Sequence, residues 1–283
     1  EEWLNAYGME QTKAILDAFS KEAPITIRTN VTKITPDALK EQLKAEGVTV
    51  QTLEELSYAG LPYTDAYHYA FAISGFDHLM ALPSFQDGLF YVQDISSMMV
   101  AEAAAPEKGA HVIDVCAAPG GKSIHLAEML DGTGSVESRD LTGYKTGLIE
   151  ENISRYQIKN MTTKVWDATV PDESAEDTAD VLVADLPCSG LGKKTAIRYK
   201  MSRGQQEELE ALQRRILDTV CSYVIKDGIM VYSTCTINPG ENQENVAWFL
   251  GKHPEFELLD MEQIYPGTQV GDGFFYARLR RIS

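Results

Sequence analysis

Beyond residue 106, short runs rich in β-branched residues alternate with segments of helical periodicity. This alternation is typical of a parallel sheet whose strands are joined by crossover helices, and it constrains the fold more than any other feature of the chain. A length of 283 residues fits one such α/β domain with a smaller module beside it. We expect strands at 111–116, 134–140, 162–167, 180–187 and 228–235, a helix at 205–224 and a final strand at 274–281.

Residues 1–90 follow another pattern, which is typical of a small α+β module. Thr35 is a candidate N-cap, with Pro36 at the first helical position and Gly47 closing the helix. No Pro-, Gly- or Ser-rich linker separates this module from residues 91–283, so we expect the two units to pack firmly. The other elements expected in the module are a helix at 1–19 and strands at 24–30 and 67–74.

The composition is that of an ordinary globular protein, with 44% hydrophobic and 24% charged residues. No apolar stretch approaches the roughly 18 to 20 residues of a spanning helix, and the first residues lack the layout of a signal peptide. We therefore expect a cytoplasmic protein. The four cysteines are too sparse for a disulfide scaffold, and the five histidines lack ligand spacing, so reduced thiols and no metal ion are expected.

The net charge of −17 argues against nonspecific affinity for nucleic acid, because phosphate neutralisation needs Lys and Arg. The charge is unevenly distributed along the chain, since residues 186–206 are basic and contain no acid although the whole chain is acidic. A solvated loop and an RNA-facing loop explain this stretch equally well. Its basic residues are Lys193, Lys194, Arg198, Lys200 and Arg203, and a second acid-free stretch carries Arg278, Arg280 and Arg281.

The segment CAAPGGKS, residues 116–123, lies where a nucleotide-binding loop is expected, between a strand and a helix. It ends like a phosphate-binding P-loop. However, Cys116 replaces the first glycine of that motif, and Pro119 has no N–H to offer to a phosphate. The loop is therefore expected to bind another kind of ligand.

Carboxylates follow three of the expected strands, at Asp140, Asp167 and Asp185. In a parallel sheet these strand ends meet at one edge, where ligands bind. Asp140 lies 19 residues after Gly121, about where a ribose-binding carboxylate belongs. A pocket ringed by acids repels phosphate but suits a sulfonium with ribose hydroxyls, which points to S-adenosylmethionine. The alternatives are that each acid merely caps a strand, or that the loop binds a dinucleotide, although it lacks G-x-G-x-x-G.

Two cysteines also stand at strand ends, Cys188 in DLPCSGLG and Cys235 in YSTCTINPGEN. A cysteine in this setting, followed by a polar turn, is placed to meet a ligand. Cys221 lies within the expected long helix and reads as a small buried hydrophobe, as Cys116 also does.

Four segments, VQDISS, DVCAAPGGKSIHLAE, DLPCSGLG and STCTINPGENQENVAWFL, occur in the order and spacing seen in the Sun (Fmu) family of RNA cytosine-C5 methyltransferases. The chain resembles this family over essentially its whole length. The resemblance implies a Rossmann-like class I methyltransferase sheet with helices on both faces, S-adenosylmethionine as cofactor and RNA as partner. Many bacterial members carry a NusB-like helical domain before this region, and we expect the present chain to lack it.

The resemblance also implies roles for single residues. Asp140 is expected to bind ribose, Asp167 to lie beside adenine, and Asp185 to lie between cofactor and target base. Cys235 is the implied nucleophile, and Cys188 is associated with product release. The methionine part of the cofactor is assigned to Cys116, Ala117, Ala118, Pro119, Gly120, Gly121 and Lys122.

The chemistry explains the need for cysteine. Carbon 5 of cytosine becomes nucleophilic once a thiolate adds at carbon 6, and loss of the carbon 5 proton and of the thiol restores the ring. The target must be unpaired or flipped out of a duplex. Small-subunit rRNA is the expected substrate, bound by a monomer, with Arg28 and Lys33 as further contributors to the RNA surface.

Three other functions remain open at this point. They are methylation of tRNA cytosine, methylation of DNA cytosine with Cys188 as nucleophile, and RNA binding by an assembly factor that no longer catalyses. The last has one argument in its favour, because Thr195 and Ala196 replace a Pro-Asp pair usual in the family.

Overall fold

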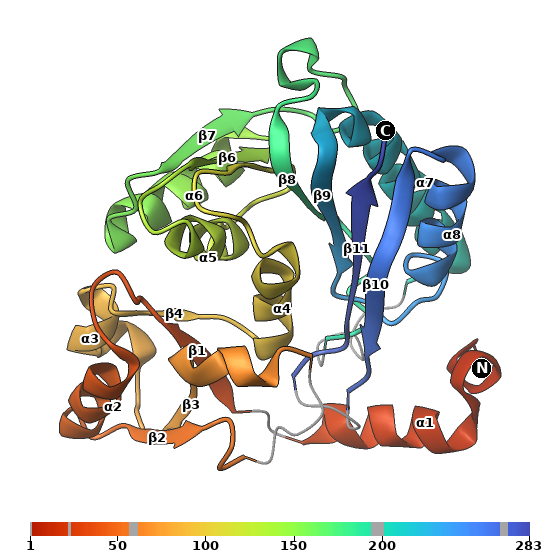
Figure 1. Cartoon of the computed structure of the whole chain (residues 1–283). Helices are drawn as coiled ribbons and strands as arrows, with labels where there is room; N and C mark the ends of the chain where they lie inside the picture. Colours follow the sequence, from red (N-terminus) through yellow and green to blue (C-terminus); the bar gives the residue numbers. More distant parts are fainter. Residues whose placement is uncertain (1, 22–23, 57–61, 194–200, 267–270) are drawn as a thin grey trace.

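The computed structural model describes residues 2–21, 24–56, 62–193, 201–266 and 271–283. Two sheets organise the chain (Figure 1). The smaller has four strands in the order β2-β3-β1-β4, and the larger has seven in the order β10-β11-β9-β8-β5-β6-β7. The chain therefore contains the two kinds of unit that its sequence pattern predicts.

The small sheet is antiparallel at each of its three pairings. Helix α2 covers it with the buried side chains Leu39 and Leu43, and begins where predicted, because the Thr35 side chain accepts a hydrogen bond from the Ala38 N–H at 3.3 Å. The elements of this part are β1 Ile25–Thr29, α2 Pro36–Ala45, β2 Thr49–Thr52, the 3₁₀ turns η1 Thr64–Tyr69 and η2 Leu79–Ala81, β3 Ala70–Ser74, α3 Pro83–Gln86 and β4 Phe90–Val92. Strand β4 spans the predicted boundary between residues 90 and 91. The division of the chain into units 1–90 and 91–283 remains a prediction.

Helix α1, Glu2–Ser20, lies apart from the small sheet (Figure 1). Its buried residues Ile15 and Phe19 cluster with Ile237, which follows strand β9 of the large sheet. The Tyr7 hydroxyl donates a hydrogen bond to the Ile237 carbonyl. The first helix of the chain thus packs beside the loop that carries Cys235.

In the large sheet, β5, β6, β7, β8 and β9 run parallel, and β11 is antiparallel to both of its neighbours. The predicted strands are present, and β10 is an additional one. It was missed because an edge strand reading FELLDMEQI lacks clean alternation. The bounds are β5 His111–Asp114, β6 Ser135–Asp140, β7 Met161–Val165, β8 Ala179–Asp185, β9 Val224–Thr234, β10 Phe256–Ile264 and β11 Phe274–Arg281.

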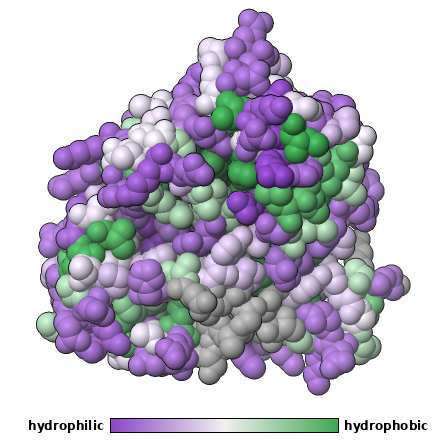
Figure 2. Space-filling model, in the orientation of Figure 1, coloured by the Kyte–Doolittle hydropathy of each residue, from purple (hydrophilic) through white to green (hydrophobic). Residues whose placement is uncertain are grey.

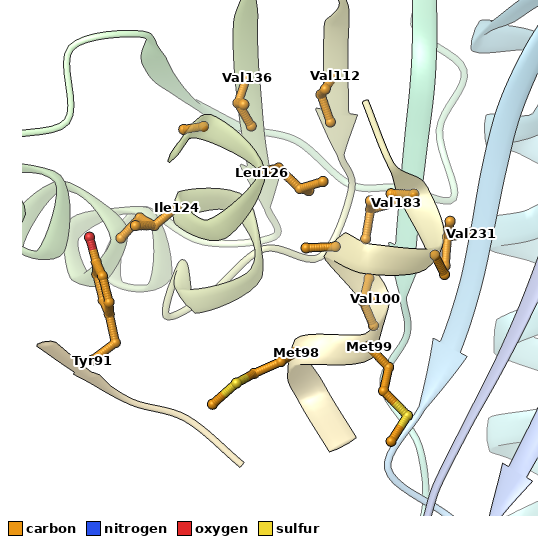
Figure 3. Close-up of a cluster of buried hydrophobic side chains, with 14 of the residues drawn as sticks. Tyr91, Met98, Met99, Val100, Val112, Ile124, Leu126, Val136, Val183 and Val231 are labelled. Atoms are coloured by element: carbon orange, nitrogen blue, oxygen red, sulfur yellow. The ribbon is translucent and has the colours of Figure 1, made fainter. Parts of the chain in front are cut away.

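Helices cover both faces of this sheet, as the predicted Rossmann-like α/β class requires. One core joins α4, α5 and α6 to the sheet, and Figure 3 shows Val100 of α4 beside Val183 of β8. The opposite core joins α7 and α8 to the sheet. Helix α4 is not among the predicted elements, because it is buried nearly all round and shows no amphipathic period. The helices and turns are α4 Ile95–Ala104, α5 Gly121–Met129, α6 Gly143–Tyr156, η3 Glu173–Ala175, α7 Arg203–Val220, η5 Cys221–Tyr223 and α8 Gln243–Lys252.

A buried ion pair joins the small sheet to helix α5, which packs on the large sheet. Arg28 of β1 is 1% exposed and pairs with Glu128 of α5. Its guanidinium lies 4.1 Å from the centre of the Tyr91 ring, and the Tyr91 hydroxyl donates to Glu128 at 2.8 Å. Arg28 is therefore not an RNA contact, contrary to the prediction. Lys33 is also engaged, since its ammonium donates to the carbonyls of Asp87 and Arg155.

The surface in the same orientation is mostly hydrophilic, with hydrophobic residues gathered over β9, β11 and β10 (Figure 2). None of the helices in the described part of the chain has the length and apolar character that a bilayer crossing requires. The arginines near the C-terminus are paired, Arg280 with Glu257, Arg281 with Asp177 and Arg278 with Asp260, which balances their charge.

We expect Arg28→Met to lower the free energy of unfolding by about 3–5 kcal/mol, because it leaves the buried Glu128 carboxylate without its cation. The double variant Arg28→Met/Glu128→Leu should lose less, since no charge is then stranded. Urea denaturation measures both. Lys108→Met, at an exposed pair with Asp131, is the control and should leave the midpoint unchanged. A double variant that is less stable than Arg28→Met would contradict this account.

Candidate active site

The predicted site residues lie along the edge of the large sheet at which the parallel strands end. The loop from Cys116 follows β5, Asp140 ends β6, Asp167 follows β7, Asp185 ends β8, and Cys235 follows β9. Each strand end thus presents one of the groups that the sequence singled out.

The glycine-rich loop is held by its neighbours. The Ala117 N–H donates to the Arg139 carbonyl at 2.9 Å, and the Pro119 carbonyl accepts from the Asn152 side chain at 2.9 Å. Gly120 has a φ of 104°, and a Cβ there would lie 3.2 Å from the Ile149 side chain. The loop therefore requires glycine at this position to pass close to α6.

Asp140 is 4% exposed and holds the glycine-rich loop in place through hydrogen bonds. It accepts hydrogen bonds from the N–H groups of Ala118 and Leu141, at 3.0 and 2.8 Å, and pairs with Lys145 at 3.0 Å. Asp167 is exposed, and hydrogen bonds from Thr169 lower the pKa of its carboxyl. Both side chains lie at the sheet edge, where the prediction placed them.

Asp185 connects the glycine loop to strand β9, which leads to Cys235. Its carboxylate pairs with the Lys122 ammonium at 2.8 Å and accepts a hydrogen bond from the Ser233 hydroxyl at 2.8 Å. Burial opposes the charge of Lys122, but Asp185 outweighs it and raises the Lys122 pKa. The ammonium thus stays charged at the end of the loop.

The two cysteines are in direct contact, with their sulfur atoms 3.3 Å apart. The hydrogen bond from Cys188 lowers the pKa of the Cys235 thiol, Lys193 and Lys122 add to this effect, and burial and Asp185 oppose it. The same contact, together with burial, raises the pKa of Cys188. Cys235 is accordingly the more readily ionised thiol of the pair, and once it is ionised Cys188 can only donate to it.

The other two thiols differ from this pair. Burial raises the pKa of Cys116, and the nearby carboxylates of Asp114, Asp140 and Asp185 add to it. Cys221 lies beyond the end of α7, buried as predicted, but in a 3₁₀ turn instead of the helix. Neither is placed or ionised as a nucleophile would be.

A buried polar network under the cysteines was not predicted. The carboxylate of Glu241 is fully buried and accepts hydrogen bonds from the Ser189 N–H at 2.8 Å and from Gln213 at 2.9 Å. Asn242 joins Thr234 at 2.6 Å and the Thr236 carbonyl at 3.0 Å. The segment after Cys235 thus holds the loop after Cys188. The sequence signal was the short NPGEN stretch, but its partners on α7 become visible only in the fold.

Asp114 also supports the glycine loop, and it is not among the predicted site residues. It is buried, accepts a hydrogen bond from Ser123 at 2.6 Å, and burial raises its pKa to about 7. It ties the strand before the glycine loop to the helix after it.

The predicted basic segment lies only partly within the described residues. Lys193 is exposed and is one of the charges acting on Cys235, and Arg203 begins α7. Lys194, Arg198 and Lys200, together with the Thr195–Ala196 departure, lie outside the described residues. Ser202 and Gln205 form a capping box at the start of this helix.

Residues 101–280 match the model of the 16S rRNA methyltransferase RsmB/F family, and residues 1–61 match a ferredoxin-like domain of RsmF/B-like methyltransferases. The chain is 34% identical over 304 aligned residues to a probable ribosomal RNA small subunit methyltransferase B of Bacillus subtilis, covering 99% of this chain and 65% of that protein. It thus spans less than two thirds of the length of this curated relative.

Solved structures agree with this match. The structure of PH0851 superimposes with a TM-score of 0.90 at 28% identity, covering 99% of this chain and 65% of that one. NSun6 from Pyrococcus horikoshii superimposes with a TM-score of 0.86 at 23% identity, covering 100% and 97%, which shows the shared fold. With its family model spanning residues 101–280, the chain belongs to the RsmB/F family of 16S rRNA methyltransferases.

Proposed function

We propose that the protein transfers a methyl group from S-adenosylmethionine to carbon 5 of a cytosine in RNA, through a covalent adduct with Cys235. The contact between Cys188 and Cys235, at 3.3 Å beside Lys122 and Asp185, is the observation that carries this proposal. Small-subunit rRNA is the proposed substrate, because that is the substrate in the name of the family.

The residues at the sheet edge fit S-adenosylmethionine. Asp140 and Asp167 offer carboxylates for ribose hydroxyls and an adenine amino group, and ribose would take the place of the Lys145 contact on Asp140. Leu141 and Val165 lie at the same edge and are 56% and 52% exposed, an apolar surface suited to adenine. The related NSun6 was solved with SFG, an analogue of S-adenosylmethionine. When bound, the cofactor supplies the methyl group as an electrophile.

The protein's own groups prepare the base. The Cys235 thiolate, favoured by the hydrogen bond from Cys188, adds to carbon 6 of cytosine, and Asp185 shares a proton with the ring nitrogen. Carbon 5 is then nucleophilic. After methylation a base removes the carbon 5 proton, the sulfur–carbon bond breaks, and Cys235 leaves as a thiolate. Cys188 lies against this sulfur and takes part in product release.

The ionisation of the two thiols bears on the alternative functions. A nucleophile at Cys188, as in methylation of DNA cytosine, would require the thiol whose pKa is raised to act ahead of the one whose pKa is lowered. An assembly factor without activity has no need of a lowered thiol pKa. The arrangement favours catalysis by Cys235. Methylation of tRNA cytosine would use the same site and is separated from the proposal by assaying both RNAs.

Covalent trapping tests the nucleophile. Small-subunit rRNA containing 5-fluorocytidine should form a stable adduct with the wild-type chain in the presence of cofactor, because fluorine at carbon 5 blocks proton loss. Cys188→Ala should also form the adduct, and Cys235→Ala should form none, as read by denaturing gel electrophoresis. The reverse pattern would show that the two roles are exchanged.

Alkylation tests the ionisation of Cys235. We expect iodoacetamide to modify Cys235 with a pH midpoint below that of an ordinary cysteine, because its folded-state pKa is lowered. Cys188→Ala should move the midpoint upward, since it removes the hydrogen-bond donor. Peptide mass spectrometry follows the rate. Cys221→Ala removes a thiol elsewhere and should leave the midpoint in place, whereas an unchanged midpoint in Cys188→Ala counts against the proposed donor.

Asp185→Asn tests the proton-sharing role. We expect turnover to fall by about 10²- to 10⁴-fold, the usual contribution of a general acid or base. Cofactor affinity, measured by calorimetry, should change only slightly. Asp140→Asn is the matched variant and should weaken cofactor binding instead. Equal losses of affinity and turnover in Asp185→Asn would contradict the separation of roles.

A further inference from the structure

Three potential metal ligands meet at the edge of the large sheet opposite to the cysteine pair. Cys221 lies in the 3₁₀ turn η5 directly after α7, His253 caps the C-terminus of α8, and Glu255 precedes β10. Strand β9 starts next to this cluster, at Val224, and runs to Thr234 beside Cys235. The cluster is therefore separate from the proposed active site.

The ligand atoms have the spacing of a tetrahedral site. The Cys221 sulfur lies 3.7 Å from His253 Nδ1, and His253 Nδ1 lies 3.1 Å from Glu255 Oε1. All three ligand atoms fall within 4.8 Å of one another. Tetrahedral zinc with its usual bond lengths gives edges of roughly 3.6 Å for sulfur to nitrogen and roughly 3.3 Å for nitrogen to oxygen. The side chains need only small shifts to reach these values.

The surroundings of His253 orient it as a ligand. Its Nε2 faces Asp218 Oδ1 at 3.1 Å, and its ring stacks on Phe249 at 4.5 Å between centroids. A carboxylate on the far nitrogen is the usual partner of a metal-bound histidine, because it fixes the tautomer that leaves the other nitrogen free to ligate. Here that nitrogen, Nδ1, points at the Glu255 carboxylate. Two acceptors at 3.1 Å repel unless a proton or a metal ion lies between them.

We propose that Cys221, His253 and Glu255 bind a divalent metal ion of the zinc class, with water as the fourth ligand. Sulfur, imidazole and carboxylate together suit zinc, and the Glu255 side chain is 33% exposed, which leaves an entry path from solvent. Binding releases the proton of the Cys221 thiol. The ion would join the ends of α7 and α8 to the start of β10. This departs from the sequence expectation of no metal, because the three ligands are too irregularly spaced to form a motif.

Metal titration of the full chain tests the site in a Cys188→Ser/Cys235→Ser background, which removes the other adjacent thiols. Co²⁺ added under reducing conditions should give a saturable thiolate-to-cobalt absorption with one ion per chain. Binding of Co²⁺ or of Zn²⁺ to the metal-free chain should release about one proton, and Zn²⁺ should displace bound Co²⁺. Cys221→Ser should abolish the absorption. Asp218→Asn, which keeps all three ligands, should weaken affinity by about 10- to 100-fold.

Two more variants keep the test decisive. Glu255→Gln, at a partly exposed position, should fold even where Cys221→Ser does not, and it should weaken binding at least tenfold. Lys252→Gln removes the ion pair with Asp218 without touching a ligand and should leave the affinity within a few-fold. Absence of saturable binding, or equal cobalt absorption in Cys221→Ser, would overturn the proposal.

Discussion

Close contact between glycine backbones sets the distance between the two cysteines. The Gly192 N–H donates to the Cys235 carbonyl at 3.1 Å, and the Gly273 N–H donates to the Gly192 carbonyl at 2.7 Å. A Cβ on Gly192 would lie 1.9 Å from the Gly273 oxygen, so a side chain at this position would force the loops apart. Three chain segments, after β8, after β9 and before β11, are thereby held side by side, and the contact between the sulfurs depends on them.

The ionisation of Cys235 depends on this geometry. A hydrogen bond between thiols exists only within a narrow range of distance, and the charges of Lys122 and Lys193 act on the sulfur because both converge on it. The fully buried Glu241 carboxylate then keeps the loop after Cys188 in place through the Ser189 N–H. Polar groups buried in this way are costly to leave unpaired, so the network strongly favours a single arrangement.

The small sheet is coupled to the same site through α5. The Arg28–Glu128 pair fixes β1 to the helix that begins with the glycine loop, and Lys122, on the first turn of that helix, contacts Asp185. Helix α1 approaches from another side, at Ile237. Both parts of the chain that precede the large sheet therefore contact elements that carry site residues.

The sequence by itself determined the parallel sheet and the strand ends that carry Asp140, Asp185 and Cys235, because periodicity and strand-end residues are local signals. It missed α4, which is buried all round, and β10, whose pattern is irregular. It also misread Arg28, because a cation in a strand gives no sign that a buried carboxylate 100 residues away will pair with it.

Only the tertiary structure decided that the sulfur atoms of Cys188 and Cys235 are in contact, how Glu241 supports the loops, and that Cys221, His253 and Glu255 converge. These properties depend on distances between segments far apart in the chain, and no local pattern encodes such distances.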